Sequence, residues 1–309
     1  MKPPVGTDKS SVVMENVYKS YEGVDAVNGI NFNVREGEIF GLLGPNGAGK
    51  STTIKMLLDF IKPDKGEIRI YGKGFSEGTK SLIGYLPEER GLYDSISVKE
   101  NLMYLASLKN EPAKQARLSA HELLTMVGLA DMGDRKVKSL SKGQRQLVQL
   151  CATLIHNPKL LILDEPFSGL DPTNRELIKK IIMKEKNIGK TVILSTHMMN
   201  EVEEMCDRVL MINHGRRVLY GRVEDIKESY ARHCITVEFE GQFPKLEGIE
   251  ESSIRNNIAE LHLRVDATPK SILKQLVDSN VAVTKFSVKE LSLNQIFITV
   301  AEAEKWISP

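Results

Sequence analysis

Hydrophobic and polar positions follow three different patterns along the chain. Near the N-terminus, two segments rich in β-branched and apolar residues flank a Glu22-Gly23 turn, and they predict paired strands at residues 12–18 and 26–34. From residue 38 onward, short apolar runs alternate with longer segments of helical spacing, which is typical of a parallel sheet covered by helices. Beyond about residue 229, strand-like alternation of apolar and charged residues returns and is interleaved with short helical segments.

These patterns divide the chain into a lead-in and two domains. We assign residues 1–11 to a flexible polar lead-in, residues 12–229 to a large α/β domain and residues 230–309 to a small α+β domain. Within the large domain, a helical insertion at about residues 88–157 separates two sheet segments. The expected fold has a mainly parallel sheet core, an antiparallel β subdomain near the N-terminus and this helical insertion.

The elements expected after residue 38 differ in length and spacing. The strands of the large domain are short and apolar, at residues 38–43, 67–71, 83–86, 160–163, 191–195 and 209–213. Its helices repeat apolar residues every three or four positions, at residues 51–60, 97–108, 113–127, 142–155, 173–186 and 198–206. The small domain is expected to have strands at 235–240, 260–265 and 281–288 and helices at 270–278 and 291–302.

A glycine-rich segment follows the predicted strand at 38–43 and reads Gly44-Pro45-Asn46-Gly47-Ala48-Gly49-Lys50-Ser51, with Thr52 next. It fits the pattern G-x-x-x-x-G-K-[S/T], in which glycines allow backbone N–H groups to point inward at phosphate oxygens. Lys50 supplies a mobile charge for the β- and γ-phosphates, and the Ser51 hydroxyl is a ligand for Mg²⁺. The alternative, a glycine turn with a chance lysine, does not explain why a strand enters the segment and a helix leaves it.

Two carboxylates, Asp164 and Glu165, follow the apolar strand predicted at 160–163. In a phosphoryl-transfer site the first acidic residue holds Mg²⁺, directly or through water, and the second orients and deprotonates an attacking water. The alternative is a buried strand that ends in a helix-capping pair. The presence of a phosphate loop in the same chain favours the catalytic interpretation.

Three further segments carry weaker signals. In Leu140-Ser141-Lys142-Gly143-Gln144, Ser141 can cap a helix whose first amides form an anion site, although for this segment alone we favour an ordinary capped helix. His197 follows a buried strand at its carboxyl end, where ligands bind in open α/β sheets. The ring of Tyr21 is placed either to stack on a nucleobase or to lie half-buried under a loop.

Composition restricts the partners of the chain. The 42 basic and 41 acidic residues leave a formal net charge of +1, which gives no general attraction to nucleic acid or to an anionic membrane. The cysteines Cys151, Cys206 and Cys234 are scattered, which suggests a reducing compartment and no structural zinc. Since no apolar window approaches the length of a membrane span, we expect any action on membranes to require a partner.

Taken together and in this order, the segments resemble the ATP-binding subunit of ABC transporters over roughly residues 12–225. Residues 44–51 match the Walker A loop, residues 140–144 the family signature and residues 160–164 Walker B. The resemblance implies a P-loop NTPase fold of the ABC cassette type, with ATP and Mg²⁺ as cofactors. It further implies that Tyr21 stacks on adenine and that Glu165, His197 and Lys50 are catalytic.

The resemblance also implies an assembly. In a head-to-tail dimer of this chain, or of this chain with a similar subunit, Ser141, Lys142, Gly143 and Gln144 contact the ATP held by the partner. Asp171, in Ser168-Gly169-Leu170-Asp171, crosses the dimer interface. A separate multi-span permease is expected to bind near the segment from Glu88 to Asp94 and the helical insertion. Leu92 and Tyr93 are candidate contacts, or else a small core under the loop.

Two positions depart from the family pattern. The signature has Lys142 where the family usually has glycine, and Glu88 replaces the usual glutamine after the strand at 83–86. A carboxylate at position 88 still ligates Mg²⁺, beside Ser51 and Asp164, but it does not donate a hydrogen bond to water. The segment Tyr85-Leu86-Pro87-Glu88-Glu89-Arg90-Gly91 and the ending Ser292-Leu293-Asn294-Gln295-Ile296-Phe297 are similar to ATPases of drug and sodium exporters.

We therefore expect an ATP-hydrolysing transporter subunit, peripheral on the cytoplasmic face of a membrane, that drives export through its permease and has no nucleic-acid partner. The alternative is a soluble ABC ATPase that acts on the ribosome or on nucleic acid, but such proteins usually carry two cassettes or a long coiled coil. A third hypothesis, a module that binds ATP without hydrolysing it, conflicts with the presence of Glu165 and His197. For the small domain we favour a dimer-stabilising role over a regulatory ligand site.

Overall fold

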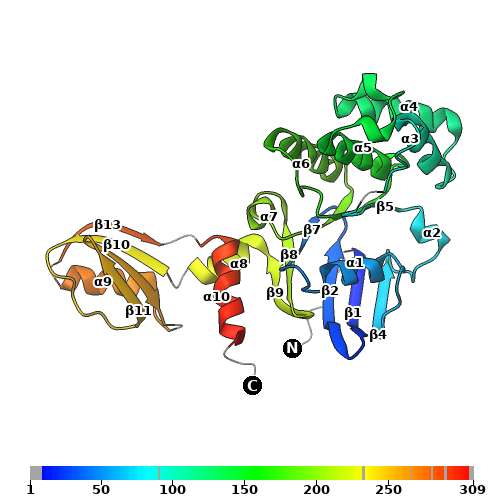
Figure 1. Cartoon of the computed structure of the whole chain (residues 1–309). Coiled ribbons are helices and arrows are strands. Elements are labelled where there is room, and N and C mark those ends of the chain that lie inside the picture. The colour runs from blue at the N-terminus through cyan, green and yellow to red at the C-terminus, as the bar shows by residue number, and fades with distance from the viewer. Residues whose placement is uncertain are drawn as a thin grey trace. The chain divides into compact units, whose positions relative to one another are not determined.

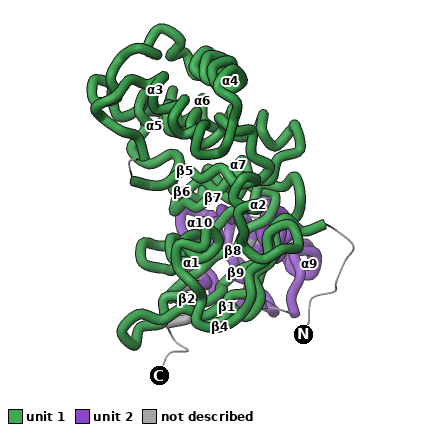
Figure 2. Tube along the Cα trace, turned by 90° about the vertical axis from the view of Figure 1, so that its right-hand side faces the viewer, with its two compact units in different colours: residues 1–220 green, residues 221–309 purple. Residues whose placement is uncertain are grey.

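The computed structural model describes residues 9–89, 91–231, 234–264, 266–279, 281–288 and 291–305. Figure 1 shows its elements, and Figure 2 colours its two compact units, Met1–Tyr220 and Gly221–Pro309. The boundary predicted between residues 229 and 230 lies within helix α8 (Val223–Ala231), which the structure assigns to the second unit. No helix of the described ranges is both long and apolar enough to span a bilayer.

Two sheets build the first unit. An antiparallel sheet has the order β2-β1-β4, with β1 at Ser10–Tyr21, β2 at Val24–Arg35 and β4 at Lys65–Ile70. The second sheet has six strands in the order β5-β6-β7-β3-β8-β9, at Ile83–Leu86, Leu160–Asp164, Thr191–Thr196, Ile39–Leu43, Arg208–Asn213 and Arg216–Arg222. The pairs β5–β6, β6–β7, β7–β3 and β3–β8 are parallel. The expected α/β fold with a mainly parallel core is confirmed.

The register of the parallel strands sets the position of the site. Asp164 at the end of β6 pairs with Ser195 of β7, and Leu43 at the end of β3 pairs with Thr196. Because parallel strands end at the same edge of the sheet, the segments that follow these three strands lie side by side. These segments are the ones that carry Gly44, Glu165 and His197.

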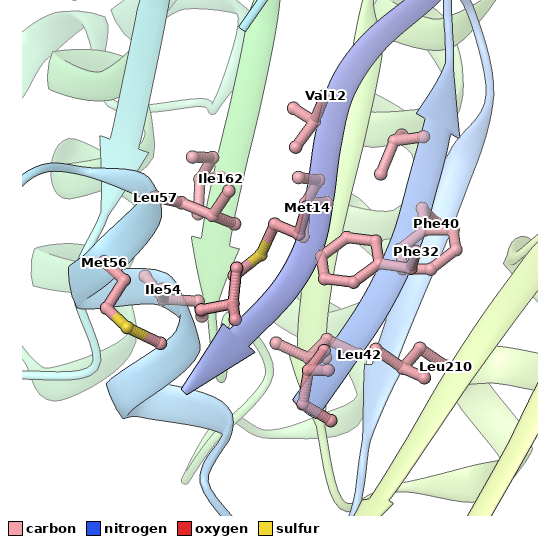
Figure 3. Packing of buried hydrophobic residues seen from close by; sticks show 14 of the residues in the cluster. Val12, Met14, Phe32, Phe40, Leu42, Ile54, Met56, Leu57, Ile162 and Leu210 are labelled. Carbon is pink, nitrogen blue, oxygen red and sulfur yellow. The ribbon is translucent and has the colours of Figure 1, made fainter. Parts of the chain in front are cut away.

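A continuous hydrophobic core joins the two sheets to α1 (Lys50–Leu57), as Figure 3 shows. The five residues of β3 are all buried, as expected for a central strand covered on both faces. Phe32 of β2 stacks on Phe40 of β3 with the ring centroids 5.3 Å apart. Burying one such side chain contributes about 1.5–3 kcal/mol, so the strand and the helix that flank the phosphate loop are held in fixed positions.

The helical insertion comprises α3 (Val98–Ser107), α4 (Ala113–Met126) and α5 (Lys142–Leu154), which contact one another (Figure 1). Two short 3₁₀ segments, Ala130–Met132 and Val137–Ser139, connect α4 to α5. The long helix α6 (Pro172–Asn187) contacts α5, and α7 (Met199–Met205) contacts β3. Helices were predicted at all five of these positions to within about two residues at each end.

The second unit contains a four-stranded antiparallel sheet in the order β11-β12-β10-β13, at Ile249–Arg255, Ile258–Leu263, Cys234–Glu240 and Ala282–Val288. Along β12 every second residue is buried, and these residues pack with Ile272 and Leu276 of α9 (Pro269–Asp278). Helix α10 (Leu293–Lys305) contacts α8. An antiparallel sheet with a helix on one face agrees with the expected α+β class.

Several elements escaped the sequence analysis. The structure adds α2 (Glu77–Lys80), α8, β9 and β11, all short or largely exposed, so that the hydrophobic pattern that reveals strands and helices is weak there. Strand β1 begins at Ser10, so the last two residues of the predicted lead-in are strand residues. Ser10 pairs with Arg35, and the Ser11 hydroxyl donates to the Val34 carbonyl at 3.2 Å. Residues 1–8 of the lead-in lie outside the described residues.

Candidate active site

The phosphate loop connects β3 to α1, and its glycines are required by its geometry. Gly44 has φ = 148° and Gly49 has φ = 109°, values that side chains rarely tolerate. A Cβ atom on Gly44 would lie 2.2 Å from the Ile212 carbonyl oxygen, and one on Gly49 would lie 2.4 Å from the Ala26 carbonyl oxygen. Two glycines are thus enclosed by backbone from the flanking strands, which fixes the course of the loop.

The other residues of the loop differ in how far they are exposed to solvent. Pro45, Asn46 and Gly47 are exposed at the tip, and a Cβ atom on Gly47 would meet nothing within 4 Å. Ala48 is buried, and Ser51 and Thr52 are half-buried in the first turn of α1. The residue that precedes this helix, Gly49, is in a left-handed conformation and has no side chain to cap the helix. The first backbone N–H groups of α1 therefore face the loop without an acceptor from the cap residue. An exposed tip beside open amides at a helix start is the arrangement that an anion site requires.

Lys50 is buried, with 6% of its surface exposed. Its ammonium donates to the carbonyl oxygens of Gly44 at 2.8 Å and Pro45 at 3.2 Å and lies 3.9 Å from Oε1 of Glu165. A buried ammonium needs such partners, because an isolated charge is strongly disfavoured away from water. The structure therefore joins the lysine of the loop to the second of the two predicted carboxylates.

Asp164 and Glu165 are both held by Ser195 of β7. The Ser195 hydroxyl donates to Oδ1 of Asp164, and the Glu165 backbone N–H donates to the Ser195 carbonyl oxygen at 3.1 Å. Burial raises the pKa of Asp164, the Ser195 hydrogen bond opposes this, and the negative charges of Glu88 and Glu165 raise it further. Glu165 has φ = 48°, a left-handed conformation that is costly outside glycine and that clusters at functional sites.

Ser195 was not recognised as a positioning residue from the sequence. The available signal was its place at the end of an apolar strand, next to the acidic pair in the register of the sheet. That register becomes known only when β6 and β7 are seen to be neighbours.

His197 follows β7, and its Nδ1 lies 3.0 Å from Oε1 of Glu165. Because a carboxylate only accepts hydrogen bonds, Nδ1 carries the proton and donates to it. The His197 side chain is 53% exposed, whereas that of Glu165 is 8% exposed. Lys50, Glu165 and His197 thus form a line that runs from the phosphate loop to the surface.

Glu88 lies on the exposed loop after β5, and its charge acts on Asp164 across the site. The loop is held by Gln149 of α5, whose side-chain amide donates to the carbonyl oxygens of Pro87 and Glu89, each at 3.1 Å. Among the described residues, no group of three His, Cys, Asp or Glu side chains is close enough to hold a metal by itself. The donors Ser51, Asp164 and Glu88 fit Mg²⁺, which is usually bound by one or two carboxylates together with phosphate oxygens and water.

The signature segment lies at the start of α5, not on the strands that lead to the phosphate loop and the acidic pair. Ser141 and Gln144 form a capping box: Ser141 Oγ accepts from the Gln144 backbone N–H at 3.2 Å, and the Gln144 side chain accepts from the Ser141 backbone N–H at 2.9 Å. A Cβ atom on Gly169 would lie 2.0 Å from Nζ of Lys142, so the lysine extends across the segment after Walker B. Gly143 faces Asn174 and Asp171 of the next helix start.

Asp171 caps α6, because its carboxylate accepts from the Asn174 backbone N–H at 3.0 Å, and this hydrogen bond lowers the pKa of Asp171. Residues 141–144 and 168–171 therefore form one surface. The segment carrying Lys142 contacts the segment that the sequence assigned to a dimer interface.

Tyr21 ends β1 and is 45% exposed. The ammonium of Lys19 lies 5.6 Å from the centroid of the Tyr21 ring and pairs with Asp64 at 2.7 Å. Asp64 also accepts from the Ser20 backbone N–H at 2.8 Å, so the end of β1 is anchored beside the ring. The structure leaves the ring accessible but does not include Tyr21 in the cluster around Lys50.

Comparison with known proteins agrees with this geometry. Residues 27–168 match the family model described as ABC transporter, and residues 221–301 match the one described as ATP-binding protein DrrA1-3-like, C-terminal domain. The chain is 36% identical to the ABC transporter ATP-binding protein YhaQ of Bacillus subtilis over 290 residues, which cover 93% of this chain and 97% of the relative. It is 30% identical to the daunorubicin/doxorubicin resistance ATP-binding protein DrrA of Streptomyces peucetius, covering 94% of this chain and 92% of the relative.

A solved structure gives the same result for the first unit. The ATP-binding subunit of an ABC transporter superposes with a TM-score of 0.67 at 28% identity, covering 72% of this chain and 93% of that one. The resemblance drawn from the motifs is confirmed, as is its extension to the C-terminal unit. The chain belongs to the ABC transporter family and is one of its ATP-binding, ATP-hydrolysing subunits.

Proposed function

We propose that this chain powers export through a separate membrane permease, as one of two ATPase subunits in a head-to-tail dimer. The observation that carries the proposal is the line Lys50–Glu165–His197 at the ends of neighbouring strands, beside a phosphate loop. The direction of transport is supported by relatives named for export or drug resistance, among them a Nod factor export ATP-binding protein of Ralstonia nicotianae, which is 34% identical.

The phosphates of ATP lie along the amides of residues 44–51 in this proposal. Lys50 exchanges its carbonyl acceptors, Gly44 and Pro45, for β- and γ-phosphate oxygens. Ser51, Asp164 and Glu88 supply oxygen ligands for Mg²⁺, which when bound neutralises charge on the phosphates. The ring of Tyr21 stacks on the adenine, with Lys19 on its other side.

Glu165 acts as the general base or water-orienting group. It is well placed because Ser195 fixes its backbone while Lys50 and His197 flank Oε1 at 3.9 and 3.0 Å. The lysine and the histidine beside the carboxylate hold it in one orientation, from which it can accept a proton from an attacking water. His197, largely exposed, contacts the γ-phosphate and reports its loss after hydrolysis.

The second wall of each site comes from the partner subunit. The surface of residues 141–144 and 168–171 has no phosphate loop of its own, yet it presents the start of α5, the ammonium of Lys142 and the interface residue Asp171. We assign it to the ATP held by the other subunit. The appended C-terminal unit is assigned to stabilising that dimer.

The permease binds at the groove beside the helical insertion. This groove has a volume of about 370 Å³ and is lined by Phe60, Tyr85, Leu92, Leu108 and residues of α5. Phe60 and Leu108 are 65% and 60% exposed, which is unusual for large apolar side chains and marks a contact surface. In this proposal the chain lies on the cytoplasmic face of the membrane.

Co-purification tests the proposal. The Glu165→Gln variant, tagged and trapped with ATP and Mg²⁺, is extracted from whole cells in mild detergent. We expect a multi-span membrane protein in stoichiometric amount. Ribosomal or nucleic-acid partners without a membrane protein would instead support the soluble alternative, which gains no support from the comparisons.

A further inference from the structure

Helix α5 donates hydrogen bonds to alternate carbonyl groups of β5 and of the loop that follows it. The donors Gln149, Thr153 and His156 lie four and then three positions apart. Gln149 and Thr153 therefore share one face of α5, and His156 extends this face just past the end of the helix. Nε2 of His156 lies 3.0 Å from the Ile83 oxygen, and the Thr153 hydroxyl donates to the Tyr85 oxygen at 3.2 Å. Gln149 then donates to the Pro87 and Glu89 oxygens.

The spacing of the acceptors has a structural cause. β5 is the edge strand of the six-stranded sheet, so its outward carbonyl groups recur at every second residue without a neighbouring strand to pair with. Residues 83 and 85 are those positions in β5, and the alternation continues at residues 87 and 89 of the loop that follows. The donors are 9%, 3% and 7% exposed for His156, Thr153 and Gln149, so buried side chains supply hydrogen bonds to these carbonyl groups; the Lys109 ammonium also donates to the Ile83 oxygen, at 3.3 Å.

Gln149 differs from the other two donors because its acceptors lie beyond the strand. Both of its hydrogen bonds, 3.1 Å each, go to the peptide groups on either side of Glu88. The far end of the same loop is held separately, since buried Asn101 of α3 bonds both the backbone N–H and the carbonyl of Tyr93. Gln149 therefore holds the backbone directly before and after Glu88.

We propose that Gln149 is a positioning residue that holds the Glu88 carboxylate toward Asp164, where it takes part in binding Mg²⁺. The inference rests on the proposed function, in which Glu88 is a metal ligand. It adds a second role for the helix that begins with the signature at Ser141: about two turns further along this helix, Gln149 sets the position of the metal ligand Glu88. A partner of a metal ligand is commonly as important as the ligand itself.

The test measures metal binding without turnover. The full chain is saturated with a non-hydrolysable ATP analogue, and Mn²⁺, as a spectroscopic substitute for Mg²⁺, is titrated by electron paramagnetic resonance. Gln149→Met keeps the length of the side chain but donates no hydrogen bond. We expect it to weaken Mn²⁺ binding about tenfold while leaving metal-free binding of the analogue unchanged.

Thr153→Val is the matched control. It removes the hydrogen bond to Tyr85 on the same helix face but leaves the peptide groups around Glu88 alone. We expect a lower midpoint of thermal unfolding and unchanged Mn²⁺ affinity. If Thr153→Val weakens Mn²⁺ binding as much as Gln149→Met does, the effect is general loosening of α5 and the inference is wrong.

Glu88→Ala separates this inference from the proposed function. If Glu88→Ala leaves Mn²⁺ affinity unchanged, Glu88 is no metal ligand and both proposals about this loop fail. If Glu88→Ala weakens binding but Gln149→Met does not, only the positioning role fails. The inference predicts that Gln149→Met has no further effect in the Glu88→Ala background. Should Gln149→Met not fold, Gln149→Ala, which removes volume rather than reshaping it, is measured in its place.

Discussion

Two helix starts in this chain carry its two most characteristic motifs, and they are built in opposite ways. Helix α1 begins at Gly49, in a left-handed conformation and without a side-chain cap, so its first amides remain available to a ligand. Helix α5 begins at Ser141 with a full capping box that uses the Gln144 amide. The first start leaves its amides open to a ligand, whereas the second satisfies one of its amides internally; in the proposed dimer the second start faces the phosphates held by the other subunit.

The difference extends to what surrounds each start. Beside α1, Glu165 Oε1 lies 3.9 Å from the Lys50 ammonium and 3.0 Å from Nδ1 of His197. At the start of α5, Lys142 lies over Gly169, and Asp171 and Asn174 lie beside Gly143. This difference is the reason for our proposal that one chain supplies the reacting groups of one site and the facing surface of another.

Glu165→Gln should have the largest effect on the α1 side. The amide keeps the shape of the carboxylate but does not accept a proton, so we expect hydrolysis to fall about 10²–10⁴-fold while ATP binding persists. Phosphate release and binding of a fluorescent ATP analogue measure the two quantities. Unchanged steady-state hydrolysis would show that Glu165 is not the general base.

Gly44→Ala should destabilise the phosphate loop, which connects β3 to α1. The new Cβ would lie 2.2 Å from the Ile212 carbonyl oxygen in a backbone of φ = 148°. We expect a loss of about 2–5 kcal/mol of unfolding free energy, from overpacking together with backbone strain. Gly47→Ala is the matched control at the open tip, where only the strain of about 1 kcal/mol applies. Equal losses in urea unfolding would contradict the account.

His156 should make the anchoring of α5 sensitive to acid. Burial lowers the pKa of His156 to about 4, against 6.5 ordinarily, and the Ile83 carbonyl opposes this only partly. The unfolded chain binds a proton below pH 6.5 that the folded protein does not bind until about pH 4, so stability falls as the pH falls through this window. The contribution is about 3 kcal/mol.

The control for this effect is His156→Gln, which has no titratable group at the position. Urea unfolding from pH 7 to pH 4 should show a shallower loss of stability for the variant than for the natural chain. Parallel pH profiles for the two proteins would mean that His156 is protonated equally in the folded and unfolded states.

Much of this organisation could be predicted from the sequence. The phosphate loop, the acidic pair and His197 each follow an apolar strand, and local patterns are enough to find such strands. The hydrogen bonds of Ser195 and Gln149 could not be predicted. They join residues 31 and about 60 positions apart, and they depend on which strands and helices become neighbours.

The same limit applies to Lys142. The sequence shows a lysine where glycine is usual in the family, but only the structure shows that its ammonium lies across Gly169, a position that has no Cβ to obstruct it. In the C-terminal unit, β11 was missed because six of its seven residues are exposed and give no alternation of burial.

Ser141→Ala should have the smallest effect on stability and still distinguish the two helix starts. Loss of the cap costs about 1 kcal/mol. Ser97→Ala removes an equivalent capping box from α3, where no role in ATP binding is proposed. Both variants should lose similar stability in thermal unfolding, but only Ser141→Ala should also slow hydrolysis. If the two variants hydrolyse ATP at equal rates, Ser141 only caps its helix and has no part in hydrolysis.

The central claim, that each site combines the phosphate loop of one subunit with the signature surface of another, is tested most directly by mixing two inactive subunits. Lys50→Met removes the charge of the phosphate loop, and Ser141→Arg blocks the signature surface. In a head-to-tail dimer of one subunit of each kind, both changes lie in the same site and the other site is intact. We predict that the mixture hydrolyses ATP well above the sum of the separate variants. Hydrolysis equal to that sum, with mixed dimers demonstrated by differently tagged subunits, would contradict the account.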